Sequence, residues 1–194
     1  MKNVLLFLPQ GFEAYEASVF TDVMGWSREV GSAPVQVVTT ALRAEIMCTW
    51  NLIVRPEAGF DTIDSKNFDA LAIPGGFESA GFYEDVYDER FLDVIRAFDR
   101  DKKPVAAVCV GALPAGKSGI LKGRKATTYD LPDGSRRREL AEFGAKVLDE
   151  RLVVDGNIVT STGPETALDV AFTLLEMLTG KENVAAVRHE MRFR

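Results

Sequence analysis

The stretch VAAVCVGALPAGKSGILKG, residues 105–123, decides how this chain is interpreted. Its first residues are apolar, as in a strand buried on both faces of a sheet. The run ends at Cys109, Gly111 follows, and residues 112–117 have the composition of a helix. A thiol between a buried strand and a helix start has the layout of a nucleophile elbow, where the helix dipole favours the thiolate. The alternative is a structural cysteine, because a free cysteine usually behaves as a small buried hydrophobe.

Strand-like and helix-like segments alternate on both sides of this stretch. Short apolar runs predict sheet strands at residues 4–8, 35–40, 68–73, 105–108 and 125–128, with hairpins at 44–56, off the main sheet, and at 146–162, turning at Asp155-Gly156-Asn157. Helical spacing and end signals predict helices at residues 16–30, 89–99, 112–117, 136–143 and 164–180. In the first helix the apolar face comprises Val19, Val23, Trp26 and Val30. This order predicts one α/β domain over residues 1–194, with a mostly parallel sheet and helices on both faces.

Two further segments fall at the carboxyl edge of the predicted sheet, where ligands bind in such folds. GFEAYE, residues 11–16, places Glu13 and Glu16 after the first strand, and Pro74-Gly75-Gly76 follows the third. A glutamate at a helix start often does no more than stabilise the helix dipole, and glycine pairs are ordinary in turns. Their arrival at the edge that carries Cys109 favours a shared site.

Composition excludes several classes of function. The 194 residues contain 23 Lys and Arg against 29 Asp and Glu, a net charge of −6, which disfavours nucleic acid as a partner. No apolar run is long enough for a membrane span and no signal-type segment is present, so we expect a cytoplasmic protein with Cys48 and Cys109 as free thiols. The single histidine, His189, has no neighbouring metal ligands. Residues 111–118, GALPAGKS, match the glycine and lysine spacing of a phosphate loop, but Gly111 already belongs to the turn after Cys109 and residues 112–117 have the composition of a helix, so we favour no nucleotide site. We therefore expect neither a metal nor an organic cofactor.

Together these motifs resemble the ThiJ/PfpI superfamily, which contains the Parkinson-disease-associated deglycase and intracellular proteases or amidases. The resemblance extends from VLLFLPQGFEAYE through ALAIPGG and AAVCVGALPAGKSGILKGRKATTY to DGNIVTSTGPETALDVAFTLLEMLTG. It implies a flavodoxin-like three-layer sandwich, commonly a homodimer. It implies that Cys109 is the reactive cysteine, that Glu16 shares a proton with it, and that the amides of Gly76 and Val110 form a small anion hole. Glu13 falls on an earlier acidic position of the motif.

The sequence departs from the superfamily pattern at the expected histidines. Deglycase-like members have TTH where this chain has Thr127-Thr128-Tyr129, and protease-like members have a histidine where this chain has Val110. Tyr129 can donate a hydrogen bond but is a poor base at neutral pH. An arginine common in the superfamily's SRGP segment is also replaced, since residues 161–164 read STGP. These departures disfavour peptide hydrolysis by a Cys-His pair, unless His189 approaches the site from a dimer partner.

The remaining chemistry is that of a cysteine beside a protonated carboxyl group. Burial should raise the pKa of Glu16, which could then donate a hydrogen bond to the Cys109 thiolate. Such a thiolate attacks small reactive carbonyls, as in a glyoxalase or deglycase, or is oxidised by peroxide. The alternatives are a non-catalytic redox sensor or chaperone-like protein that reads out Cys109 oxidation, and an amidase-like hydrolase.

Three groups of residues near these motifs have simpler expected roles. Cys48 and Trp50 should pack at a dimer contact, as the superfamily hairpin often does. Arg136, Arg137 and Arg138 should be a solvated helix start. Phe12, Phe77, Phe82 and Tyr83 could line the cleft.

Overall fold

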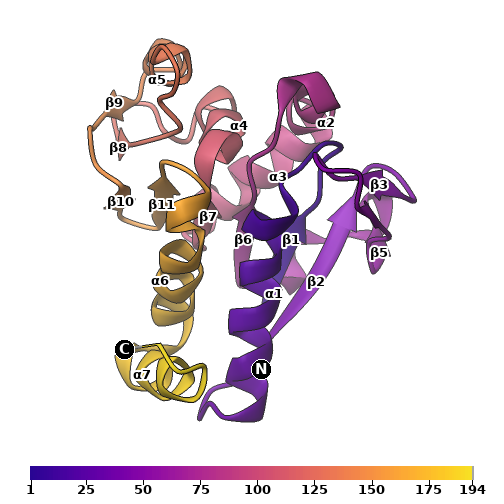
Figure 1. The fold of residues 1–194 in the computed structure, drawn as a ribbon, viewed down its shortest axis with the longest axis vertical. Helices are drawn as coiled ribbons and strands as arrows, with labels where there is room; N and C mark the ends of the chain where they lie inside the picture. Colours follow the sequence, from indigo (N-terminus) through magenta and orange to yellow (C-terminus); the bar gives the residue numbers. More distant parts are fainter. Residues whose placement is uncertain (194) are drawn as a thin grey trace.

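The computed structural model describes residues 1–193, and its core is a seven-stranded sheet in the order β10-β11-β7-β6-β1-β2-β5. These strands are β1 (Lys2–Phe7), β2 (Val35–Ala41), β5 (Ala58–Gly59), β6 (Ala70–Ile73), β7 (Val105–Ala107), β10 (Leu152–Asp155) and β11 (Ile158–Ser161). All neighbouring pairs are parallel except the β10–β11 hairpin. The flavodoxin-like α/β fold is therefore confirmed (Figure 1).

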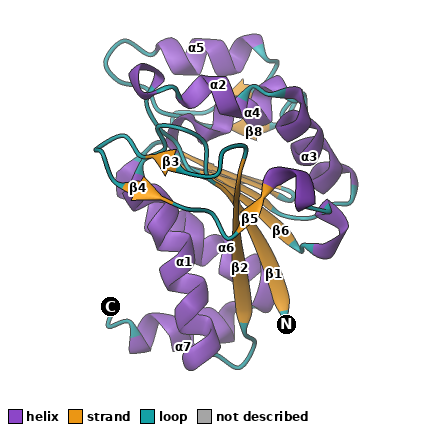
Figure 2. Cartoon of the chain, turned by 90° about the vertical axis from the view of Figure 1, so that its right-hand side faces the viewer, coloured by secondary structure: helices purple, strands orange, loops and turns teal. Residues whose placement is uncertain are grey.

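Helices cover both faces of this sheet (Figure 2). Their bounds are α1 (Ala14–Glu29), α2 (Phe82–Val86), α3 (Glu89–Arg100), α4 (Ala112–Lys117), α5 (Ser135–Glu142), α6 (Ala167–Thr179) and α7 (Lys181–Glu190). Helices α1 and α6 lie on one face and α3 on the other, while α2, α4 and α5 gather beyond the carboxyl ends of the strands. Helix α7 lies at the opposite end of the molecule.

The core forms where the apolar pattern predicts it. Residues Val4, Leu5, Leu6 and Phe7 of β1 are fully buried, as are β6 beside it and β7 on the other side of β6. Helix α3 begins after Asp88, whose side chain accepts a hydrogen bond from the Arg90 amide. The buried face of α3 comprises Phe91, Leu92, Ile95 and Phe98.

Several elements differ from the sequence prediction. The predicted strand at 125–128 shortens to β8 (Lys125–Ala126) and pairs with β9 (Lys146–Val147) outside the main sheet. The hairpin at 44–56 is confirmed as β3 (Ile46–Met47) and β4 (Ile53–Val54), which form their own antiparallel pair. The last predicted helix begins with a 3-10 turn, and the prediction missed α7, which Gly180 separates from α6. It also missed β5 and α2, which are too short to show a period.

Two residues assigned to the buried face of α1 are in fact exposed. Trp26 is 41% exposed and Val30 is 36% exposed, whereas Val19 and Val23 are buried as predicted. The inward position of the last turn belongs to Ser27, whose hydroxyl accepts a hydrogen bond from the first amide of β2. A small polar residue in that position joins helix and strand, and it leaves the neighbouring large side chains facing outward.

Candidate active site

The loops that follow β1 and β6 are paired with each other at the carboxyl edge of the sheet. Phe12 and Gly76 form an antiparallel bridge, the Glu13 amide donates to the Gly75 carbonyl at 2.9 Å, and the Phe77 amide donates to the Gly11 carbonyl at 3.1 Å. Two segments far apart in the sequence therefore form one backbone platform beside the end of β7.

Cys109 occupies a strained turn at the end of β7. Its φ of 58° is in the left-handed region, which is unfavourable for a residue with a side chain. The turn is held by hydrogen bonds from the Thr128 hydroxyl to the Cys109 carbonyl and from the Gly111 amide to the Val108 carbonyl, both 2.8 Å long. A Cβ at Gly111 would lie 2.7 Å from the Ile73 carbonyl oxygen, so the close approach requires glycine there. The predicted strand, sharp turn and helix are thus all present.

Glu16 and Cys109 lie side by side above Gly75. The Gly75 amide donates to Glu16 Oε2 at 2.6 Å, while Oε1 has no hydrogen-bond partner among the described residues. A Cβ built on Gly75 would lie 2.7 Å from Cys109 Cβ and 2.7 Å from Glu16 Oε2. Gly75 therefore creates the space in which the carboxyl group and the thiol meet.

Burial governs the ionisation of this pair. It raises the pKa of Glu16 to about 8; the charge of Glu13 adds to the increase, and the Gly75 amide and the Cys109 thiol oppose it. Burial also raises the pKa of the Cys109 thiol. The charge of Glu16 raises this pKa further, and the hydrogen bond from the Val110 amide lowers it. The expected rise for Glu16 is present. The expected lowering of the Cys109 pKa is absent, because burial disfavours the thiolate more than the amide at the helix start stabilises it.

The raised pKa of Glu16 determines which protonation state of the Glu16–Cys109 pair is populated. At neutral pH most molecules have a protonated Glu16 carboxyl. Once the pair has lost one proton, the proton that remains can reside on oxygen or on sulfur. A thiolate formed in this way would accept hydrogen bonds from the Glu16 carboxyl and from the Val110 amide.

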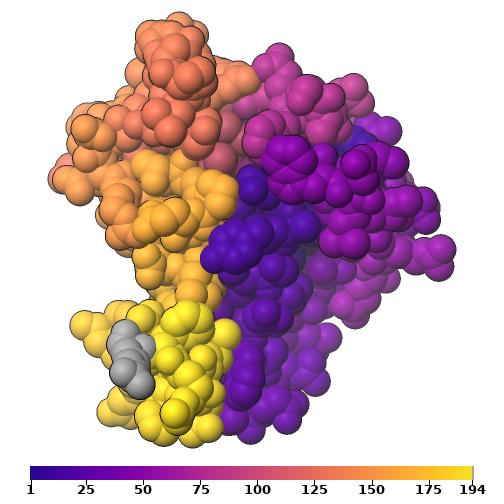
Figure 3. All heavy atoms as spheres, in the orientation of Figure 1, coloured from indigo at the N-terminus to yellow at the C-terminus, as the bar shows by residue number. Residues whose placement is uncertain are grey.

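The Cys109 side chain opens into a cleft of about 590 Å³. The residues lining it are Glu13, Gly76, Phe77, Glu78, Ser79, Tyr83, Cys109, Val110, Tyr129, Leu131, Pro132, Ser135, Arg136 and Pro164. One wall is formed by residues 77–83 before and within α2, and the other by residues 129–136 at the start of α5. In Figure 3, α5 and α2 form neighbouring projections at the top of the molecule. The structure therefore brings Cys109, Val110, Gly76, Glu13 and Tyr129 to one cleft, with Glu16 buried beneath it.

Two expected aromatic wall residues and two of the three arginines are placed differently from the prediction. Phe12 and Phe82 are buried in the core, since one belongs to the paired loops and the other lies on the inward face of α2. Arg136 lines the cleft with a side chain 27% exposed, and Arg137 is only 21% exposed. Arg138, 64% exposed, is solvated as expected. A run of like charges thus contains both cleft-facing and solvent-facing members.

Tyr129 and His189 do not form the base that the superfamily's histidine would supply. Tyr129 is half-buried at the cleft wall, beside Gly163. His189 lies on α7 at the opposite end of the molecule, and its ring contacts Glu190 at 3.2 Å. Among residues 1–193 of one chain, no Cys-His pair is formed.

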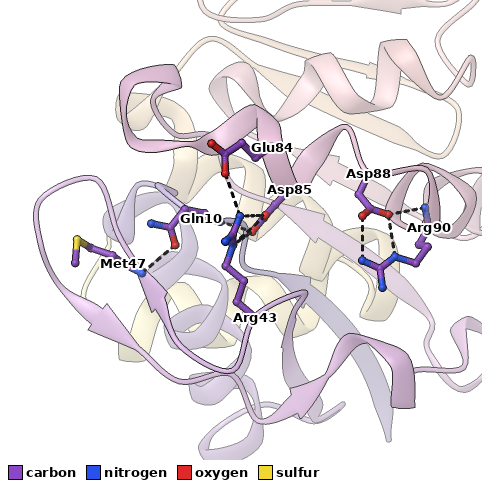
Figure 4. Close-up of polar contacts among 7 residues, drawn as sticks. All are labelled: Gln10, Arg43, Met47, Glu84, Asp85, Asp88 and Arg90. Atoms are coloured by element: carbon purple, nitrogen blue, oxygen red, sulfur yellow. Dashed lines mark hydrogen bonds and ion pairs between the residues drawn. The ribbon is translucent and has the colours of Figure 1, made fainter.

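An ion pair between the exposed Arg43 and the buried Asp85, which sequence inspection missed, holds the first of the two paired loops. Asp85 of α2 accepts hydrogen bonds from the Arg43 guanidinium and, at 2.8 Å, from the Gln10 amide (Figure 4). The Gln10 side chain accepts a further hydrogen bond from the Met47 amide, and Arg43 also pairs with Glu84. This network fixes residues 10–13 against α2 and the β3–β4 hairpin, and so supports Glu13 and the start of α1.

No helix within residues 1–193 is long and apolar enough to cross a membrane. Cys48 and Cys109 are both free thiols, as predicted. Cys48 is buried within its own chain, whereas Trp50 is 69% exposed and packs edge to face against Phe77.

Comparison with known proteins identifies the family. The DJ-1/PfpI family matches residues 2–177. Protein dj-1beta of Drosophila melanogaster is 28% identical over 190 residues, covering 96% of this chain and 94% of the relative. Isonitrile hydratase of Pseudomonas putida is 32% identical over 146 residues, covering 73% of this chain and 58% of the relative. The crystal structure of Drosophila melanogaster DJ-1beta superimposes with a TM-score of 0.86 at 25% identity, covering 100% of this chain and 98% of that chain. On the match over residues 2–177, this chain belongs to the DJ-1/PfpI family.

Proposed function

We propose that this protein is a cysteine-dependent enzyme of stress metabolism that acts on small reactive carbonyls, with Cys109 as nucleophile and Glu16 as its acid and base. The observation that carries the proposal is the meeting of a buried carboxyl group and a thiol above Gly75, at the floor of a cleft of about 590 Å³. Paired groups with perturbed pKa values in a cleft are typical of catalytic sites.

The reaction can be completed with these groups alone. The thiolate attacks the aldehyde carbon of a glyoxal, the sulfur–carbon bond forms, and the carbonyl oxygen takes a proton from Glu16 to give a hemithioacetal. The Glu16 carboxylate then removes the proton from that carbon to give an enediolate and returns it to the neighbouring carbon. The hydroxyl proton of the hemithioacetal passes to the neighbouring oxygen, so a thioester of a 2-hydroxy acid remains on Cys109. Water cleaves the thioester to a 2-hydroxy acid and restores the thiol. The amides of Gly76 and Val110 would face the developing oxyanion.

A second candidate is oxidation of Cys109 as a signal, in a redox sensor or chaperone-like protein. The Val110 amide lowers the pKa of the thiol, so it is directed at the sulfur and could hold an oxygen added to it. General stress protein 18 of Bacillus subtilis is a relative, 40% identical over 113 residues that cover 58% of this chain. An amidase-like hydrolase is the least supported candidate, because His189 lies far from the cleft and Tyr129 is a poor base.

Turnover and oxidation measurements separate these functions. We expect methylglyoxal to be converted to lactate by the wild type and by Cys48→Ala, which removes the other thiol, but not by Cys109→Ala or Glu16→Leu. If the wild type shows no turnover, yet gains oxygen mass at Cys109 under mild peroxide, the sensor is supported and the enzyme is rejected. Trapping of an acyl group on Cys109 by an amide substrate would support the hydrolase.

We further propose that the protein acts as a cytoplasmic homodimer. Tyr15, Trp50, Leu52 and Ile53 are exposed large side chains on α1 and around the β3–β4 hairpin. Tyr15 and Leu52 border an apolar groove between these elements, a surface suited to a second copy. Two unpaired cysteines are consistent with a reducing compartment.

A further inference from the structure

Arg136 is held at the wall of the Cys109 cleft by contacts from three directions. Its Nη1 donates to Glu139 at 3.0 Å, its Nη2 donates to Glu78 at 2.6 Å, and its guanidinium carbon lies 4.9 Å from the centre of the Tyr83 ring. The Glu139 contact is within α5, whereas Glu78 lies across the cleft, 58 positions earlier in the chain. The guanidinium group is therefore oriented over an aromatic ring, between the two cleft walls.

This guanidinium group retains the capacity to bind an anion. The two hydrogen bonds use two of the five N–H donors of an arginine. The Glu78 side chain is 70% exposed, and an ion pair to such a group contributes little and exchanges readily with solvent or another carboxylate. The Glu139 side chain, 27% exposed, is the more permanent partner. Glu78 thus occupies a place that a ligand carboxylate could take.

The guanidinium group of Arg136 lines the same cleft as Cys109. Arg136 is the only lysine or arginine among the described residues that line the cleft. Tyr83 lines the same cleft as Cys109, and its ring lies under Arg136. A small molecule in this cleft could present one end to the sulfur and the other to the guanidinium group.

We propose that Arg136 binds the carboxylate of an acidic electrophile whose reactive carbon faces Cys109. In the absence of this electrophile, Glu78 pairs with Arg136, and the carboxylate of the electrophile displaces Glu78 when it binds. The preferred carbonyl substrate would then be a 2-oxoaldehyde that carries a carboxylate further along its chain, such as 4,5-dioxopentanoate, rather than a neutral glyoxal. This substrate preference rests on the proposed carbonyl chemistry, whereas the anion site beside the thiol does not.

Alkylation of Cys109 tests the anion site without requiring turnover. The probes are iodoacetate and its longer homologue N-(iodoacetyl)glycine, each compared with its neutral amide. In every case the thiolate displaces iodide, a carbon–sulfur bond replaces the carbon–iodine bond, and the thiol proton passes to buffer. The measured quantity is the ratio of the acid rate to the amide rate, which cancels changes in the thiol itself.

For at least one acid, Arg136→Gln should lower this ratio about tenfold, the effect of losing a charge-assisted hydrogen bond. Arg136→Lys should retain part of the preference. Glu78→Gln should raise the ratio several-fold, because it removes the competing carboxylate. Arg138→Gln removes the same charge from an exposed position of the same helix and should leave the ratio within about twofold, apart from a small long-range effect.

The outcomes distinguish this inference from the proposed function. Ratios that are insensitive to both Arg136→Gln and Glu78→Gln, for both acids, would overturn the anion site even if methylglyoxal is turned over. Ratios that respond as expected would support the anion site even if no aldehyde is turned over, in which case the carbonyl chemistry fails. Where aldehydes are turned over, the kcat/KM for 4,5-dioxopentanoate relative to methylglyoxal should follow the same order among the variants.

Discussion

Replacing Glu16 with glutamine should make the protein more stable at neutral pH. The pKa of Glu16 rises from an ordinary value of 4.5 to about 8 in the folded chain. As pH rises, the unfolded chain loses this proton first. The wild type is therefore most stable, with respect to this group, below pH 4.5, and it loses that contribution progressively until pH 8.

The size of the effect follows from this pKa. Between pH 4.5 and 8 each pH unit costs about 1.4 kcal/mol, so at pH 7 the penalty is about 3 kcal/mol. A glutamine carries no such penalty, and its oxygen can still accept the hydrogen bond from Gly75. Its NH₂ group would lie where Glu16 Oε1 has no protein partner, which reduces the gain by about 1 kcal/mol. We expect Glu16→Gln to be about 2 kcal/mol more stable than the wild type at pH 7.

Urea unfolding followed by circular dichroism at pH 5, 6, 7 and 8, at constant ionic strength, measures this difference. The advantage of Glu16→Gln should grow by about 3 kcal/mol between pH 5 and pH 8. Glu78→Gln is the matched control, because it removes an exposed carboxylate from the same cleft and should keep the wild-type pH dependence. Parallel stability curves for Glu16→Gln and the wild type would refute the assignment of Glu16 as a buried, largely protonated acid.

Three other substitutions test the geometry of the site and the fold. Gly75→Ala should destabilise the protein by about 2 kcal/mol and slow alkylation of Cys109, since its Cβ would meet both partners of the pair, whereas Gly59→Ala, with open space around it, should do neither. Cys109→Gly should be about 1 kcal/mol more stable than Cys109→Ala in thermal unfolding, because glycine tolerates the left-handed backbone; equal stability would show that the turn is unstrained. Asn183→Ala should lower the free energy of unfolding by about 2 kcal/mol, because the buried Asn183 amide bonds to the backbone N–H and C=O of Ala33, and a change below about 0.5 kcal/mol would contradict this.

The fold was predictable because its main strands are continuous apolar runs. The segments around β1, β6 and β7 carry few polar residues, and turn residues follow each of them. Their alternation with amphipathic helices leaves few arrangements besides a parallel sheet. The meeting of Glu16 and Cys109 followed from that arrangement and from the resemblance, since both residues come just after the carboxyl ends of strands.

Contacts made between distant segments were not predictable in the same way. Arg136 appears in the sequence as one of three exposed charges, and its partner Glu78 belongs to another loop. Asp85 likewise finds Arg43 only when α2 packs beside the β3–β4 hairpin. The pKa of Cys109 depended on how deeply the turn is buried, which no pattern of residue types reports.

The position of β7 within the sheet has a consequence for synthesis of the chain. This strand lies between β6, which precedes it, and β11, which is made more than 50 residues later by the sequence numbers of the two strands. On the ribosome, or in a fragment that ends before Ile158, one side of β7 has unpaired backbone groups and invites association with other extended chains. Premature termination in this interval should therefore yield insoluble products, whereas completing the β10–β11 hairpin closes the gap.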